Sequence, residues 1–108
     1  METIRRRRDF LAAARARRAS TPSLTLQGRD RGDAAPARVG YTCSRKVGHA
    51  VARNRAKRRL REAARLALAP EARPGWDYVL VGRPHATAAR DFASLQDDLR
   101  GALARVHG

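Results

Sequence analysis

Cysteine, aromatic side chains and long hydrophobic runs are all scarce in this sequence. The single cysteine, Cys43, excludes an internal disulfide bond and any metal site built from cysteines alone. Only five residues are aromatic, so a core has to consist mainly of Leu, Val and Ala. No run is long enough for a membrane-spanning helix, and no secretory apolar segment follows the N-terminal arginines. These absences favour a small cytoplasmic protein.

Acidic residues are also few, with 10 Asp and Glu against 24 Lys and Arg and a formal net charge of +14. Such an excess of positive charge indicates a polyanionic partner, of which nucleic acid is the most common. An anionic membrane surface is a weaker candidate, because no segment joins a basic face to a bulky apolar one. The length of 108 residues predicts a single domain, residues 1–108, with one modest core.

The most basic stretch, residues 45–65, holds nine Lys or Arg and one acid, Glu62. Neither Gly nor Pro interrupts it from Ala50 until Pro70, which predicts a helix with Asn54, or a residue just before it, as the N-cap. At about 100° per residue, small apolar side chains share one arc: Ala56, Leu60, Ala63, Ala64, Ala67 and Leu68. The opposite arc is polar and cationic: Asn54, Arg55, Arg58, Arg59, Arg61 and Arg65. Acids that would pair with these arginines are missing, so the face is expected to bind a polyanion.

Periodicity predicts five further elements. Two are helices: residues 4–19, ended by Pro22, and a final helix with apolar positions at Phe92, Leu95, Leu99, Leu103 and Val106, capped by Asp91 or Thr87. Three are strands: residues 23–28, 38–44 and 77–82, the last apolar on both faces and therefore central. The loop at residues 27–33 is expected to close a hairpin between the first two strands. In the strand at 38–44, the small row Gly40, Thr42 and Ser44 is expected to leave an open surface.

The resulting order, helix-strand-strand-helix-strand-helix, predicts an α+β fold, a two-layer α/β sandwich with a mixed sheet.

Catalytic and metal sites are not expected. The acids are scattered, and the adjacent pair Asp97 and Asp98 point about 100° apart on a helix. His49, His85 and His107 have no recognisable partner, His107 is expected in a frayed terminus, and Cys43 is most simply a core thiol.

Residues 39–48, VGYTCSRKVG, followed by Ala50-Val51, by RNRAKR at 53–58 and by Arg61, resemble the signature of the bacterial ribonuclease P protein component. The family pattern is a strand ending in Ser-Lys-Lys-x-Gly, a short connection and a helix opening with Arg-Asn-Arg. An Asp-Phe in the first helix, a strand ending in Arg-Pro and a closing amphipathic helix extend the resemblance. Arg45 stands where the family usually has Lys.

The resemblance implies a protein subunit whose ribonucleoprotein removes the 5′ leader of precursor tRNA, with catalysis carried out by the RNA subunit. The implied partners are ribonuclease P RNA and precursor tRNA, and no protein partner is evident. The implied cofactors are that RNA and Mg²⁺ in the holoenzyme, with none bound by the protein alone. A left-handed βαβ crossover around the Arg-Asn-Arg helix is also implied, as is a further short strand, expected at residues 47–51. A small basic ribosomal or RNA-chaperone protein is the alternative.

Two groups of residues are expected to bind RNA. The first should contact the RNA subunit: Arg45, Lys46, Arg53, Asn54, Arg55, Lys57, Arg58, Arg59, Arg61 and Arg65. The second should hold the single-stranded leader in a cleft between the first helix and the open face of the sheet: Phe10, Arg15, Arg17 and Tyr41. Phe10 could equally pack in the core, and Ala14 stands where the family commonly has a second aromatic residue.

Overall fold

A five-stranded sheet forms the centre of the molecule, with the spatial order β1-β4-β5-β3-β2. The structure, a computed structural model, describes the backbone of residues 1–108 and every side chain except that of Arg45. The strands are β1 (Glu2–Thr3), β2 (Arg17–Ser20), β3 (Leu24–Asp30), β4 (Arg38–Cys43) and β5 (Trp76–Gly82). The β1–β4 and β4–β5 pairs are parallel, while β2–β3 and β3–β5 are antiparallel. The predicted α+β class with a mixed sheet is confirmed.

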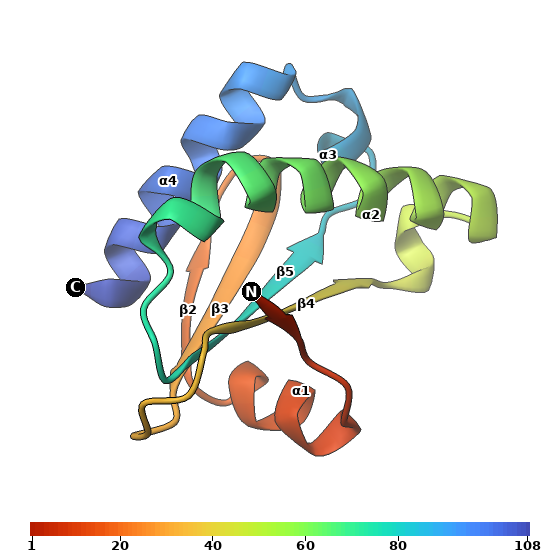
Figure 1. Cartoon of the computed structure of the whole chain (residues 1–108). Helices are drawn as coiled ribbons and strands as arrows, with labels where there is room; N and C mark the ends of the chain where they lie inside the picture. Colours follow the sequence, from red (N-terminus) through yellow and green to blue (C-terminus); the bar gives the residue numbers. More distant parts are fainter.

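Four helices cover the two faces of this sheet: α1 (Arg7–Ala14), α2 (Ala50–Ala63), α3 (Ala86–Ala89) and α4 (Phe92–His107). A 3₁₀ turn, Arg45–Val47, precedes α2, and a π-helical segment, Ala64–Leu68, and a 3₁₀ turn, Ala69–Glu71, prolong it. Helices α2 and α4 lie on one face, while α1 lies on the other (Figure 1). Because α2 connects the parallel neighbours β4 and β5, the predicted βαβ crossover is present.

The main core lies between the sheet and the pair α2 and α4. Its largest fully buried side chains are Leu and Tyr residues from both layers, including Leu26, Leu60, Tyr78, Leu80 and Leu99. A smaller cluster under α1 contains Ile4, Ala13 and Val79, with Phe10 and Val81 packed against it. Strand β5 is therefore apolar on both faces because each face meets a core, as its sequence predicts.

The last helix also forms as predicted. Asp91 is its N-cap and accepts a hydrogen bond from the backbone N–H of Ser94 at 3.2 Å. Contrary to the expected frayed terminus, His107 lies in the last turn of α4. Its Nε2 is 2.6 Å from the Tyr78 hydroxyl, and its ring centroid is 5.0 Å from that of Trp76. Burial is the main cause that lowers the pKa of His107, and the positive charge of Arg73 lowers it further. This histidine therefore ties α4 to β5.

The N-terminal part differs most from the prediction. The expected helix at residues 4–19 is α1 followed by β2, which pairs with β3 from Arg17↔Gly28 to Ser20↔Thr25. Pro22 lies in the turn of this hairpin, where the Thr21 hydroxyl accepts hydrogen bonds from the N–H groups of Ser23 and Leu24. Arg and Ala favour helices, but here the pairing with β3 and the burial of Ala19 stabilise a strand instead.

Two further expectations about the sheet are wrong. Residues 27–33 do not close a hairpin, because β5 lies between β3 and β4. The additional strand expected at residues 47–51 is instead the end of a 3₁₀ turn and the start of α2. The strands that the sequence does not predict are β1 and β2. Strand β1 pairs with β4, which is far away in sequence, and β2 pairs with β3 across a tight turn.

The small row of β4 is covered at Gly40. A Cβ atom at this position would lie 2.5 Å from Cε1 and 2.7 Å from Cζ of Phe10. Helix α1 therefore sits directly on the strand there, and the expected open surface does not extend to Gly40.

Gly40→Ala should accordingly reduce the free energy of unfolding by about 1–3 kcal/mol, the usual cost of overpacking. Gly101→Ala in α4 is the matched control, because apart from its chain neighbours and the backbone of its own helix no described atom lies within 4 Å of the added Cβ. This second change should stabilise the protein by about 1 kcal/mol through helix propensity. Urea unfolding of both variants measures the difference. Equal midpoints for Gly40→Ala and the unmodified protein would show that α1 is not seated on the strand.

Candidate nucleic-acid interface

Helix α2 separates its apolar and cationic side chains as the sequence predicts. The arc that should face the sheet is buried throughout: Ala56, Leu60, Ala63, Ala64, Ala67 and Leu68. Alanines on this arc let the helix lie close to β4 and β5. The helix begins at Ala50, with His49 as N-cap residue, so Asn54 lies inside it and is not the cap. Five residues on the opposite side are exposed: Asn54, Arg55, Arg58, Arg61 and Arg65.

The exposed face of α2 carries almost no compensating acid. Among the described side chains, the one ion pair along α2 and its π-helical extension joins Arg65 Nη2 in the extension to Glu62 Oε1 in α2 at 2.5 Å. Most other acids pair with arginines elsewhere, for example Asp98 with Arg90. Like charges spaced three and four residues apart repel one another, so a bound polyanion would stabilise this surface.

Two arginines of α2 stack on aromatic rings at opposite sides of the helix. The Arg61 guanidinium carbon is 5.5 Å from the centroid of Tyr41 in β4. The Arg59 guanidinium carbon is 5.6 Å from the centroid of Phe92 at the start of α4, and its Nη2 donates to the carbonyl of Arg90. Arg59 is therefore half-buried against α4, whereas the helical projection places it on the outward arc.

The remaining predicted RNA-subunit contacts lie near the N-terminal end of α2. Lys46 is exposed in the 3₁₀ turn. Arg53 and Lys57 are half-buried and lie close enough to Cys43 to affect its thiol, although burial, the larger cause, raises the pKa of Cys43. Both point toward the end of β4, because they fall on the same side of the helix as Leu60. The Arg45 side chain lies outside the described residues.

The four residues predicted to bind the leader do not share one cleft. Phe10 packs in the smaller cluster under α1, and Arg15 is exposed at the end of that helix. Tyr41 packs against the main core on the opposite face, where burial raises its pKa and Arg61 opposes this shift. Arg17 also turns to that face, since its Nη1 donates to the carbonyl of Val106 in α4 at 3.0 Å. The expected cleft with both aromatics is wrong, because α1 covers only the Gly40 side of β4.

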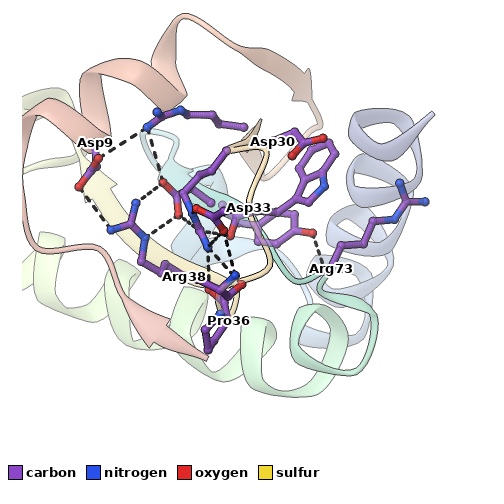
Figure 2. A network of polar contacts seen from close by, with 12 residues as sticks. Asp9, Asp30, Asp33, Pro36, Arg38 and Arg73 are labelled. Carbon is purple, nitrogen blue, oxygen red and sulfur yellow. Dashed lines mark hydrogen bonds and ion pairs between the residues drawn. The ribbon is translucent and has the colours of Figure 1, made fainter.

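A charge network that the sequence alone does not reveal lies at the end of the sheet where β4 and β5 begin. Asp77 in β5 is fully buried, and its carboxylate lies 2.5 Å from Arg31 Nη1 and 2.7 Å from Arg38 Nη2. Asp9 of α1 joins through Arg38 at 3.4 Å and Arg29 at 3.6 Å (Figure 2). Burial alone would raise the pKa of Asp77, but the hydrogen bonds from Arg38 and Arg31 hold it below the usual value. These arginines are paired with acids within the fold, unlike the exposed Arg55 and Arg58 on α2.

A family model described as ribonuclease P matches residues 1–107. The chain belongs to the ribonuclease P protein family. It is 62% identical over 109 residues to the ribonuclease P protein component of Ruegeria pomeroyi, covering 99% of this chain and 87% of the relative. The corresponding protein of Caulobacter vibrioides is 52% identical, with 94% of this chain and 68% of the relative covered. The resemblance predicted from residues 39–61 is thereby confirmed.

Solved ribonuclease P proteins have the same fold. The Thermotoga maritima protein superposes with a TM-score of 0.80 at 28% identity and 100% coverage of both chains. The Staphylococcus aureus protein gives a TM-score of 0.77 at 22% identity, covering 100% of this chain and 99% of the other. At 22% identity, the likeness to the Staphylococcus aureus protein shows the fold alone.

Groups that could perform acid–base or metal chemistry in this family member are dispersed. Within the described residues, His, Cys, Asp and Glu side chains nowhere gather in a group of three or more that could hold a metal ion. Asp97 is exposed, while Asp98 accepts from the Ser23 hydroxyl at 2.6 Å and from Arg90. None of the helices that the structure describes has the length and apolar character needed to cross a membrane.

Proposed function

We propose that this chain is the protein subunit of a cytoplasmic ribonuclease P ribonucleoprotein and that the outward face of α2 binds the RNA subunit. The observation that carries the proposal is the set of exposed arginines Arg55, Arg58 and Arg61, which have no acidic partner among the described residues. Family membership supports the identity of the RNA. In this assembly the RNA cleaves precursor tRNA at the 5′ end, and Mg²⁺ belongs to the RNA.

The leader of precursor tRNA is assigned to the opposite face of the sheet, beside α1. Phe10 is partly buried there, Arg15 is exposed nearby in sequence, and Thr42 of β4 is half-exposed in the row that follows Gly40. An aromatic edge next to a cation suits a single strand, whose bases stack and whose phosphates attract arginine. Tyr41 and Arg17 are left out, because they face α2 and α4.

The protein acts in this proposal by binding and positioning. Holding leader and RNA subunit together raises the effective concentration of substrate at the catalytic RNA. Screening of phosphates by the cationic face makes Mg²⁺ easier to bind to the RNA. Reconstitution with a bacterial ribonuclease P RNA at low Mg²⁺ tests this directly. Precursor tRNA cleavage should rise on adding the protein, whereas a ribosomal or RNA-chaperone protein would bind RNA without this specific stimulation.

Removing the candidate acid–base groups should leave the chemical step intact. His49→Ala, His85→Ala, Asp97→Ala and Asp98→Asn should each retain a single-turnover cleavage rate within a few-fold of the unmodified holoenzyme at saturating protein and Mg²⁺. The asparagine at 98 keeps an acceptor for Ser23 and Arg90, so the fold is preserved. A fall of about a hundredfold or more in one variant, the size typical of losing a general acid or base, would instead place catalysis in the protein.

A further inference from the structure

An open hollow lies where the outward face of α2 and its π-helical extension meets the first residue of α4. It has a volume of about 600 Å³, and its lining consists of Arg58, Arg59, Arg61, Glu62, Arg65 and Phe92. Small-molecule sites in proteins commonly measure about 300–1,000 Å³, so the space is of the size that holds one small ligand. Four of its six lining residues are arginines and one is an acid, so it favours an anionic occupant.

The aromatic wall of this hollow is held in a defined position. Phe92 is the first residue of α4, directly after the cap residue Asp91, and it is half-buried against the main core. The Arg59 guanidinium stacks on its ring and is anchored by the Arg90 carbonyl. Phe92 and Arg59 are thus in cation–π contact, and both kinds of side chain are surfaces on which unpaired RNA bases stack.

Arg59 also carries an unused donor. Its Nε is buried and has no hydrogen-bond partner among the described residues. It is the one buried side-chain nitrogen or oxygen without a partner in the described part of the chain. Buried donors in folded proteins normally have partners. Because Arg59 lines the hollow, a base carbonyl or phosphate oxygen bound there is a candidate acceptor for this donor.

We propose that this hollow receives one unpaired nucleotide of the bound RNA, with its base against the Phe92–Arg59 pair and its phosphates near Arg58 and Arg65. The inference rests on the proposed docking of ribonuclease P RNA on α2, because Arg58, Arg61 and Arg65 belong both to that face and to the hollow. An acidic peptide would match the charges but not the need for a flat, stacking group. The RNA footprint is thereby extended from α2 onto the first turn of α4.

The test compares Phe92→Leu with Phe92→Tyr in binding to ribonuclease P RNA and in chemical probing of its bases. Leucine keeps the apolar volume and loses the aromatic face, so affinity should fall by about 5- to 150-fold, the range for one lost base stack. The salt dependence should stay unchanged, since no charge is removed. One unpaired base should regain reactivity while the backbone protection persists. Phe92→Tyr should behave like the unmodified protein, and Leu11→Ala on α1, an exposed apolar residue, serves as the control.

Unchanged affinity and unchanged base reactivity in Phe92→Leu would overturn the nucleotide site while leaving docking on α2 intact. Failure of the unmodified protein to bind the RNA would overturn the proposed function and this inference together. A second measurement needs no variant at Phe92: RNA containing 4-thiouridine at unpaired positions should crosslink to the peptide that includes Phe92. Crosslinks confined to other peptides would also exclude the site.

Discussion

Replacing Asp77 by alanine is expected to lower the free energy of unfolding by about 3–5 kcal/mol, the cost of breaking a buried ion pair by removing one partner. Natural domains have about 5–15 kcal/mol in total, so the variant should be marginally folded or unfolded. Urea unfolding followed by circular dichroism measures this loss. It should be the largest stability effect of any single acidic residue in the chain.

The reason lies in the position of Asp77 between two strands. Its register partners are Arg29 in β3 on one side and Arg38 in β4 on the other, so the carboxylate joins the three central strands. Its side chain is fully buried, and those of Arg31 and Arg38 are 9% and 25% exposed. Without the carboxylate these guanidinium groups keep their desolvation cost and lose their counter-charge. Arg31 also holds the loop before β4, donating to the carbonyls of Ala35 and Pro36 (Figure 2).

The same carboxylate predicts acid sensitivity with a definite sign. The pKa of Asp77 in the folded protein lies below its value in the unfolded chain, about 3.9. Its stabilising contribution is therefore complete above about pH 4 and disappears as the pH falls through the lower folded-state pKa. Asp77→Asn removes this titration and should flatten the stability profile in that acidic range. Asp97→Ala is the control, since Asp97 is exposed and pairs only with Arg100 at the surface. An Asp77 variant as stable as the Asp97 variant would contradict the structural role.

The central part of the chain could be predicted from sequence because its signals are local. Periodicity alone places Leu60 and its neighbours under α2 and the arginines outside, and the burial of the helix follows that pattern. The same projection puts Arg53 on the side of Leu60, which is where it lies, half-buried near Cys43. The match to the family's Arg-Asn-Arg motif predicts RNA contact for Arg53, and this stays a prediction; the helical position adds only that the side chain lies toward the end of β4.

Features that depend on pairing over long sequence distances could not be predicted in this way. Nothing local in RRAS at residues 17–20 favours a strand; β3 and α4 supply the reason. Likewise, the alternation of β4 indicates that Gly40 and Tyr41 face opposite sides, but not that α1 covers the Gly40 side. The alternation by itself therefore does not exclude a cleft that holds both Phe10 and Tyr41, which is what the sequence analysis expects. The Asp77 network required the strand order, because its arginines come from β3, β4 and the loop between them.

The distribution of acids explains how a chain with a net charge of +14 keeps a folded sheet and a free cationic face. Asp9, Asp33 and Asp77 neutralise arginines at one end of the sheet, and Asp98 neutralises Arg90 beside α4. Glu62 is the one acid on α2. If α2 binds RNA as proposed, stability and RNA binding draw mainly on different arginines, so the free energy of unfolding and the RNA affinity should respond to different substitutions.

The triple variant Arg55→Ala, Arg58→Ala and Arg61→Ala should lose RNA affinity while it keeps its fold. Each lost phosphate contact reduces the slope of log affinity against log salt by about 0.7–0.9, so three contacts reduce it by about 2.1–2.7. Extrapolated from 1 M salt, where the electrostatic gain vanishes, this slope change is a loss of about 100- to 500-fold at 0.1 M salt. Alanine favours helix formation, and removal of like charges relieves repulsion along α2. These gains should offset the lost stacking of Arg61 on Tyr41, about 0.5–1 kcal/mol.

Salt titration of binding to ribonuclease P RNA, together with thermal unfolding, measures both halves of this expectation. A matched control removes the same charge elsewhere, with Arg5→Ala, Arg7→Ala and Arg100→Ala, three exposed arginines that lie outside α2. The control should keep most of the affinity if α2 is the docking surface, because its charges act only through the long-range field, which is screened beyond about 10 Å at 0.1 M salt. Equal losses in the two triple variants would mean that net charge, and not the face of α2, determines binding. An unchanged slope in the α2 variant would remove those three arginines from the interface altogether.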